Sequence, residues 1–151
     1  FKGLPHRLEL IKTVKGVRYY NDSFSTTPET AIAAIESFDT PKILILGGSS
    51  KGSDFTELGE IISSDDSIKA IISVGKEWER IKTEIRNHEL GTRIKIIEGL
   101  GSMKEVVEAA AEIAELGDVV LLSPACASFD KFKNYKDRGE QFRREVEGLG
   151  N

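Results

Sequence analysis

The sequence predicts an α/β domain of the Rossmann-like, three-layer type, with a mostly parallel sheet and an N-terminal hairpin at one edge. After Pro41, short apolar runs alternate with segments whose apolar residues recur at helical spacing. The runs are continuously apolar, as is typical of strands covered on both faces in a parallel sheet. The connections between them are short, which favours repeated βα units with right-handed crossovers.

The chain begins with the predicted hairpin and a first helix. Residues 8–14 and 17–20 are rich in strand-forming residues, and Lys15-Gly16 between them supplies a glycine for a two-residue turn. Thr27 and Pro28 then have the N-cap and first-turn chemistry of a helix. Apolar residues follow at helical spacing: Ala31, Ile32, Ile35 and Phe38.

The rest of the chain predicts regular βα units. Ser102 and Glu105 have the spacing of a capping box ahead of a helix that Gly117 is expected to end. Strands are expected at 43–46, 70–74, 94–97 and 119–122, and helices from about Asp54, around 78–85, from Ser102, and over a last segment with Phe142, Val146 and Leu149. We expect one domain over residues 1–151, with residues 1–5 as an interdomain linker and the chain as a fragment of a longer protein.

Composition excludes several classes of function. Net charge is −4 with acids and bases interspersed, so neither a nucleic acid nor an anionic membrane is expected as a partner. No apolar run approaches the roughly 20 residues of a membrane span. The single cysteine excludes an internal disulfide, and His6 and His88 are too far apart for a local metal motif. We expect a cytoplasmic monomer.

The segment from Leu121 to Tyr135 has the pattern of a binding site at the end of a buried strand. Its small residues let backbone N–H groups approach a ligand, and a helix beginning there would favour a carboxylate or phosphate. Ser128 would add a hydroxyl donor, although it can equally be explained as a helix cap. Cys126 has no partner histidine or acid at a recognisable spacing, so we interpret it as a buried packing residue.

Two further loops follow predicted strands. Residues 47–54 are rich in glycine and contain Lys51, yet they match neither the P-loop nor the dinucleotide-binding motif. Lys51 and Ser128 at one sheet edge could hold a dicarboxylate, whereas a solvated surface lysine is the simpler alternative. Residues 21–28 offer many hydroxyls and are adequately explained as a turn with an N-cap. The pair His6-Arg7 can be an ordinary solvated pair.

Together these motifs resemble the Mur ligases of peptidoglycan synthesis. The longest match is Ser-Pro-Ala-Cys-Ala-Ser-Phe-Asp-x-Phe-Lys-Asn-Tyr at 123–135, followed by Asp137-Arg138-Gly139 and Phe142. Blocks at 3–9, at 21–26 and at 46–55 match in the same order. The chain is thereby similar, over essentially its whole length, to the C-terminal domain of the D-glutamate-adding branch of this family.

The resemblance implies an ATP-dependent, amide-bond-forming ligase that adds D-glutamate to UDP-N-acetylmuramoyl-L-alanine through an acyl phosphate. This domain would hold D-glutamate and close on ATP, while the catalytic residues and the Mg²⁺ and uridine-nucleotide sites belong to preceding domains. The isolated domain would be inactive. By the resemblance, D-glutamate is bound by Thr26, Lys51, Ser128, Phe129 and Tyr135, and ATP by His6, Arg7 and Asp22.

One residue departs from the family pattern, which has a lysine where this sequence has Phe24. Any electrostatic role of that position is lost or relocated in this chain. Three alternatives stay open: a related ligase domain of the folylpolyglutamate type, a non-enzymatic nucleotide- or anion-binding α/β module, and a purely structural or interaction domain.

Overall fold

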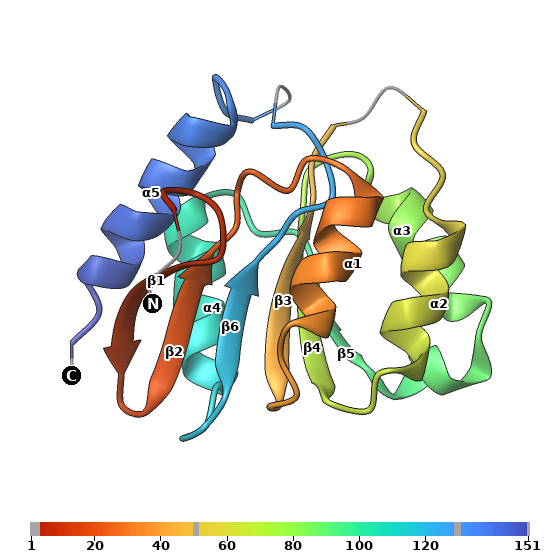
Figure 1. The fold of residues 1–151 in the computed structure, drawn as a ribbon, viewed down its shortest axis with the longest axis horizontal. Coiled ribbons are helices and arrows are strands. Elements are labelled where there is room, and N and C mark those ends of the chain that lie inside the picture. The colour runs from red at the N-terminus through yellow and green to blue at the C-terminus, as the bar shows by residue number, and fades with distance from the viewer. Residues whose placement is uncertain (1–3, 50–51, 129–130, 151) are drawn as a thin grey trace.

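In the computed structural model, residues 4–49, 52–128 and 131–150 are described, and they form a six-stranded sheet between two layers of helices (Figure 1). The strands are β1 (Glu9–Val14), β2 (Val17–Asn21), β3 (Lys42–Gly47), β4 (Ile68–Val74), β5 (Lys95–Ile97) and β6 (Val119–Leu122). The helices are α1 (Pro28–Glu36), α2 (Thr56–Ser64), α3 (Trp78–Arg86), α4 (Met103–Ile113) and α5 (Tyr135–Glu147), with a 3₁₀ turn η1 (Glu89–Arg93).

The strand order β1-β2-β6-β3-β4-β5 confirms the predicted fold class. β1 pairs antiparallel with β2 at one edge, and the remaining neighbours pair in parallel. At one end of the sheet, Leu122 pairs with both Asn21 and Ile45, and Gly47 pairs with Val74. The loops that follow β2, β6, β3 and β4 therefore leave the sheet side by side, as predicted.

Two apolar cores lie on opposite faces of the sheet. Leu44, Leu46 and Leu121 belong to the core under α1, α2 and α3, whereas Ile43 and Ile45 belong to the core under α4 and α5. Because side chains alternate between the two faces of a strand, a strand covered on both sides has no polar face. This explains why β3 and β6 are buried along their whole length.

The helix starts follow the predicted capping chemistry at two sites. Thr27 caps α1 and accepts a hydrogen bond from the N–H of Thr30, and Ser102 caps α4 and accepts one from the N–H of Glu105 at 3.2 Å. The expectation that Gly117 ends α4 is wrong, because the helix stops at Ile113. Gly117 instead adopts a φ of +97° in the turn into β6, which explains the glycine by backbone conformation.

Helix α5 approaches the start of the chain closely at Gly139. A Cβ atom at this position would lie 2.1 Å from Nδ1 of His6 and 3.0 Å from Nδ2 of Asn21. The glycine therefore lets α5 pack directly on the side chains that flank the hairpin.

We expect Gly139→Ala to destabilise the chain, although alanine is the better helix former by about 1 kcal/mol. The added methyl group would displace His6, an overpacking that costs about 1–3 kcal/mol. Gly148→Ala is the matched control, because a Cβ there would meet carbonyl oxygens of Arg144 and Glu145 at an ordinary 3.5 Å. Urea unfolding of the two variants measures the difference, and a Gly139→Ala chain as stable as the parent would contradict this packing argument.

Candidate functional site

Three loops at the carboxyl ends of the strands are joined by backbone hydrogen bonds. The N–H of Ser49 donates to the carbonyl of Ala127 at 2.8 Å, and the N–H of Gly47 donates to that of Pro124 at 2.9 Å. The N–H of Ala125 donates to the carbonyl of Ser25 at 3.0 Å. The loops after β2, β3 and β6 thus form one continuous structure, as expected for the carboxyl ends of adjacent parallel strands.

The glycines of the loop after β3 are required by close approach. Gly47 and Gly48 have φ of +119° and +146°. A Cβ at Gly47 would lie 1.8 Å from the carbonyl oxygen of Val74, and one at Gly48 would lie 2.4 Å from that of Ala127. Larger residues would push apart the loops that the site needs together.

The carboxylate of Asp22 is buried among donors at the start of the first of these loops. Its oxygens accept hydrogen bonds from the N–H of Leu8 at 3.0 Å, from Oγ of Ser123 at 2.8 Å, and from Oγ of Ser25. Burial raises the pKa of this carboxyl above its ordinary value, while these hydrogen bonds and the charge of Arg7 act in the opposite direction. Since a carboxylate has about four acceptor positions, one remains after these three bonds.

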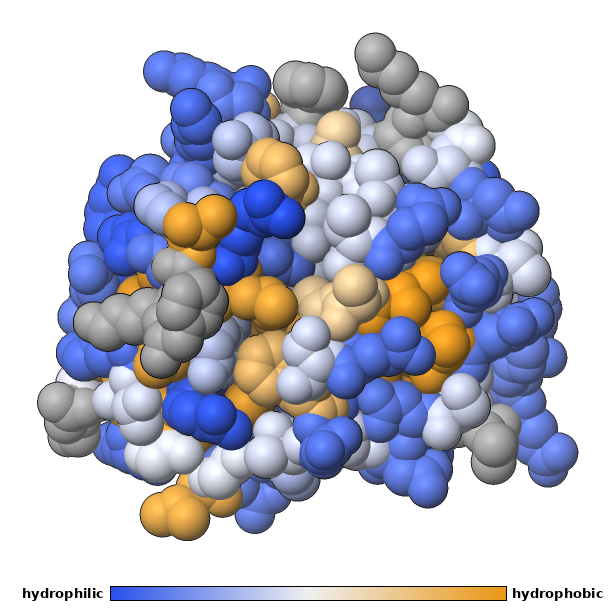
Figure 2. All heavy atoms as spheres, viewed as in Figure 1, coloured by the Kyte–Doolittle hydropathy of each residue, from blue (hydrophilic) through white to orange (hydrophobic). Residues whose placement is uncertain are grey.

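A groove of about 570 Å³ lies between the hairpin and α1, and Asp22 faces it. Figure 2 shows apolar side chains gathered over these elements on this face of the molecule. Arg7 is exposed at the same groove, and its guanidinium carbon lies 4.9 Å from the centre of the Phe24 ring. The structure therefore brings two of the three residues expected at ATP, Arg7 and Asp22, to a common open surface. The other lining residues are Leu4, Leu8, Tyr20, Ser25, Thr30, Ala33, Ala34, Ser37 and Phe38.

The third of these residues, His6, is turned inward. Nδ2 of Asn21 lies 3.0 Å from Nδ1 of His6, and Oδ1 of Asn21 accepts from the N–H of Ser23 at 3.0 Å. This arrangement makes Nδ1 the acceptor and leaves the proton on Nε2, which faces Glu140 at 3.6 Å. Burial lowers the pKa of the imidazole, against the charges of Glu140 and Glu9, which raise it. A neutral, packed ring is the consequence, and its part in nucleotide binding stays a prediction.

Ser128 lies in a narrow cleft at the end of the third loop, which has no room for a water molecule. The cleft is lined by Gly47, Gly48 and Gly75 and by Lys131. Ser128 is buried and Tyr135 is half-buried at the start of α5. Lys51 and Phe129 lie outside the described residues, and Thr26 is half-buried in the loop after β2. Of the residues expected at D-glutamate, the structure thus places Ser128 beside the glycine-rich loop.

The possible helix start at Ser128 is not realised. The carbonyl of Ser128 accepts from the N–H of Phe132 in a turn, and α5 starts at Tyr135. Its cap is Asn134, whose side chain accepts from the N–H of Asp137 at 2.8 Å. An anion at Ser128 would therefore meet backbone and hydroxyl donors of a loop, without the dipole of a helix. The Asn134-to-Asp137 spacing was the available signal for this boundary.

Arg138 belongs to the matched sequence motif, and the structure gives it a structural role. It is fully buried and donates from Nε to Oγ of Ser23 at 2.8 Å, and from its terminal nitrogens to the carbonyls of Ser23 and Cys126 at 2.6 and 2.9 Å. It thus ties the loop after β2 to the loop after β6. Arg138 lies four residues before Phe142 on the buried face of α5, so helical spacing could have revealed it.

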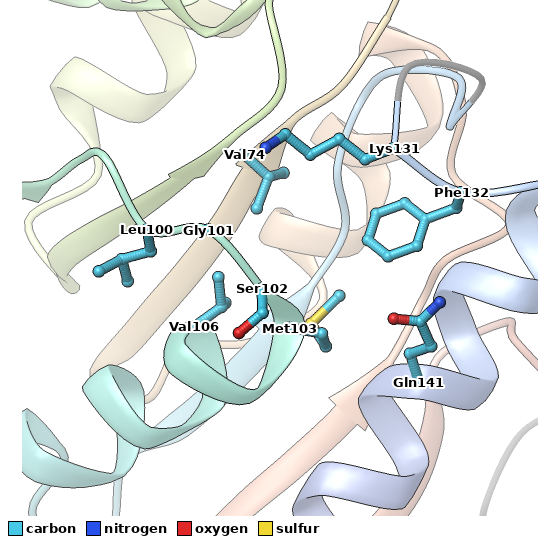
Figure 3. A pocket seen from close by; sticks show the side chains of 9 residues that line it. All are labelled: Val74, Leu100, Gly101, Ser102, Met103, Val106, Lys131, Phe132 and Gln141. Atoms are coloured by element: carbon cyan, nitrogen blue, oxygen red, sulfur yellow. The ribbon is translucent and has the colours of Figure 1, made fainter.

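A second cavity, of about 160 Å³, lies behind this cleft (Figure 3). Phe132 and Gln141 flank it on one side and the start of α4 on the other, and the side chain of Lys131 extends across it. Val74, Lys131 and Phe132 line both spaces. The segment that follows Ser128 therefore borders a cavity that side chains do not fill.

The described residues exclude some chemistry. Cys126 is fully buried in an apolar cluster, which agrees with its interpretation as a packing residue. Within ranges 4–49, 52–128 and 131–150, no three His, Cys, Asp or Glu residues lie together in a way that could hold a metal ion. In the same ranges, no helix has the length and apolar character needed to cross a bilayer.

The chain is similar to known amino-acid ligases. Residues 6–126 match the family model described as Mur ligase, glutamate ligase domain. The chain is 43% identical over 148 residues to the UDP-N-acetylmuramoylalanine--D-glutamate ligase of Aquifex aeolicus, and 46% identical over 149 residues to that of Porphyromonas gingivalis ATCC 33277. These matches cover 97% and 99% of the chain but 34% and 32% of the relatives, so the chain spans about a third of their length.

Solved structures agree on the fold. The MurF ligase of Thermotoga maritima in complex with ADP matches with a TM-score of 0.58 at 21% identity, over 97% of this chain and 32% of that one. The murein peptide ligase mpl of Psychrobacter arcticus 273-4 matches with a TM-score of 0.66 at 15% identity, over 100% and 32%. At these identities the likeness shows a shared architecture alone.

Asp22→Asn tests the buried carboxylate through pH. Because the folded-state pKa of Asp22 is raised, the folded chain binds this proton more tightly than the unfolded chain does. The stability that Asp22 contributes is therefore greatest below the unfolded pKa, near 3.8, and falls as pH rises through the folded pKa. We expect the difference in unfolding free energy, parent minus variant, to decrease as pH increases from 4 to 7 in urea titrations. A difference that grows with pH would show that the hydrogen bonds outweigh the burial.

Proposed function

The chain belongs to the Mur ligase family, as a glutamate ligase domain, and on that premise we propose that it is the acceptor-binding domain of an ATP-dependent ligase that joins D-glutamate to UDP-N-acetylmuramoyl-L-alanine. The substrates are those in the names of the relatives at 41–46% identity. The structural observation that carries the proposal is the joining of the loops after β2, β3 and β6 at one sheet edge. These loops contain the residues expected to bind the acceptor.

On the acceptor side, D-glutamate carries two carboxylates, which need donors at two ends of a small site. Ser128 would offer a hydroxyl beside glycine backbone once its narrow cleft widens, and Lys51 would supply an ammonium from the loop that continues from Ser49. Thr26, Phe129 and Tyr135 would complete the pocket. The parts of Lys51 and Phe129 rest on the sequence motif, because both residues lie outside the described ranges.

On the nucleotide side, Arg7 would meet phosphate oxygens and Asp22 a ribose hydroxyl. Arg7 is exposed and presents a planar guanidinium fork, which suits phosphate. Asp22 has one acceptor position left and faces the groove. The inward His6 would act on this side through Asn21 and the entry to β1.

The proposed reaction proceeds in two steps. The γ-phosphoryl group of ATP passes to the donor carboxylate and ADP leaves; the amine of D-glutamate then attacks the acyl carbon, loses a proton, and phosphate leaves. The residues described here would bind and orient the acceptor amine and close over the nucleotide. Such positioning can lower a barrier by several kcal/mol. We propose that Mg²⁺ and the acyl donor are held by the part of the ligase that these residues do not include.

Lys51→Ala and Ser128→Ala, made in the full-length ligase, are expected to reduce kcat/KM for D-glutamate about tenfold to hundredfold. Each variant removes a charge-assisted contact of roughly 1.5–3 kcal/mol to a carboxylate. The KM for ATP should change little. Lys104→Ala removes the same charge from an exposed position on α4 and is the control. Steady-state kinetics of ADP release measures both constants, and unchanged D-glutamate kinetics in both variants would refute the acceptor site.

The 151-residue chain alone is expected to bind ATP weakly, with no saturation below about 1 mM. Its described nucleotide-side groups are Arg7 and one free acceptor on Asp22, and its glycine-rich loop is not a P-loop. Isothermal titration with ATP measures this directly. Micromolar affinity would mean that the nucleotide site is complete within this chain and needs no closing domain.

A further inference from the structure

Phe24 occupies an unusual position between the two proposed subsites. It is a large apolar side chain with 42% of its surface exposed. The guanidinium carbon of Arg7 lies 4.9 Å from the ring centre. The ring of Tyr135 lies 5.1 Å away at 84°, an edge-to-face contact. One ring therefore touches a residue from the nucleotide side and a residue from the acceptor side.

The backbone around Phe24 fixes this position from both sides. The N–H of Phe24 donates to the carbonyl of His6 at 2.9 Å, next to Arg7 in the chain. Oγ of Ser23 donates to the carbonyl of Tyr135 at 2.7 Å. The ring is thus anchored to the segment that carries Arg7 and to the start of α5.

Arg7 needs such a contact in order to hold one orientation. Within residues 4–49, 52–128 and 131–150, no hydrogen bond or ion pair involves its guanidinium group, and the side chain is exposed. A cation over an aromatic face is attracted by the ring quadrupole. The contact with Phe24 also stabilises the orientation of the Tyr135 ring, because edge-to-face aromatic pairs are favourable beyond the area that they bury.

We propose that Phe24 is a positioning residue that orients Arg7 for the nucleotide and Tyr135 for the acceptor through contacts with one ring. The proposal rests on the proposed function for what Arg7 and Tyr135 bind. The contacts themselves do not depend on it. Phe24 occupies the position where the resemblance implies a lysine, so an aromatic contact takes the place of a charge.

The contacts can be tested in the 151-residue chain. In the parent, the Phe24 ring current shifts the side-chain proton resonances of Arg7, and Phe24→Leu is expected to return them to ordinary values. Phe38→Leu is the matched control. Phe38 packs on Tyr20 in the same groove, and among the described residues its ring makes no contact with the guanidinium of Arg7 or the ring of Tyr135. Resonances of Arg7 that respond equally to both variants, or to neither, would overturn the proposal.

The consequence is tested in the full-length ligase. Phe24→Leu is expected to raise the KM values for ATP and for D-glutamate together, each about two- to tenfold, with kcat little changed. Phe24→Tyr keeps a ring and should restore both. Leu116→Ala should alter neither, because Leu116 is exposed beside Gly16 of the hairpin turn, at the opposite end of the sheet from the site loops. In an Arg7→Ala background, Phe24→Leu should leave the KM for ATP unchanged, since the residue it orients is gone.

Two outcomes would overturn the coupling. The first is an effect of Phe24→Leu that is equal in the presence and absence of Arg7, and the second is equal kinetics of Phe24→Leu and Leu116→Ala. Lys51→Ala and Ser128→Ala in the same assay separate this failure from failure of the proposed function. If these two variants lose D-glutamate use while Phe24→Leu does not, the acceptor site stands and the positioning role falls.

Discussion

The buried carboxylate of Asp22 joins three segments that are far apart in the sequence, and the geometry of the candidate site depends on it. It accepts from Leu8 at the entry to β1, from Ser25 in the next loop, and from Ser123 at the end of β6. A buried charge is costly unless donors surround it, so the carboxylate needs these three donors together in order to stay buried. The same carboxylate faces the groove with one acceptor position left. A structural role and the proposed binding role therefore coincide in one side chain.

Arg138 complements this carboxylate from the opposite side of the loops. Its guanidinium group is fully buried and bonds to the carbonyls of Ser23 and Cys126. Loops at a sheet edge have few apolar contacts, so their relative positions depend on such polar ties. Asp22 and Arg138 each bond to residues of both loops, so the loops after β2 and β6 are tied together at two places. The positions of Ser128 and Phe24, which lie on these loops, depend on the hydrogen bonds made by Asp22 and Arg138.

Most of the fold could be predicted because its signals are local. The hairpin turn at Lys15-Gly16, the cap at Thr27 and the capping box at Ser102 are short patterns with a direct physical meaning, and each appears where it was expected. The sequence left the start of α5 open, because small residues after a strand suit both a helix start and an irregular loop. The inward side chains of His6 and Arg138 were not predicted as such. Asn21 is 15 residues from His6, and Ser23 is 115 residues from Arg138. Helical spacing can place Arg138 on the buried face of α5, but periodicity carries no information about such long-range partners.

The direction of β1 has a mechanical consequence. Because β1 is antiparallel to β2, the chain enters the sheet at the edge that bears the candidate site, through His6 and Leu8 at positive φ. In a rigid rotation about this entry, the adjacent loops after β2 and β6 lie close to the axis and therefore move a short distance. The far strand, β5, lies at the other end of the sheet and travels along a much longer arc. In the proposed ligase, a rotation of this domain about that entry would carry β5 far, while the residues proposed to meet a neighbouring surface would move little.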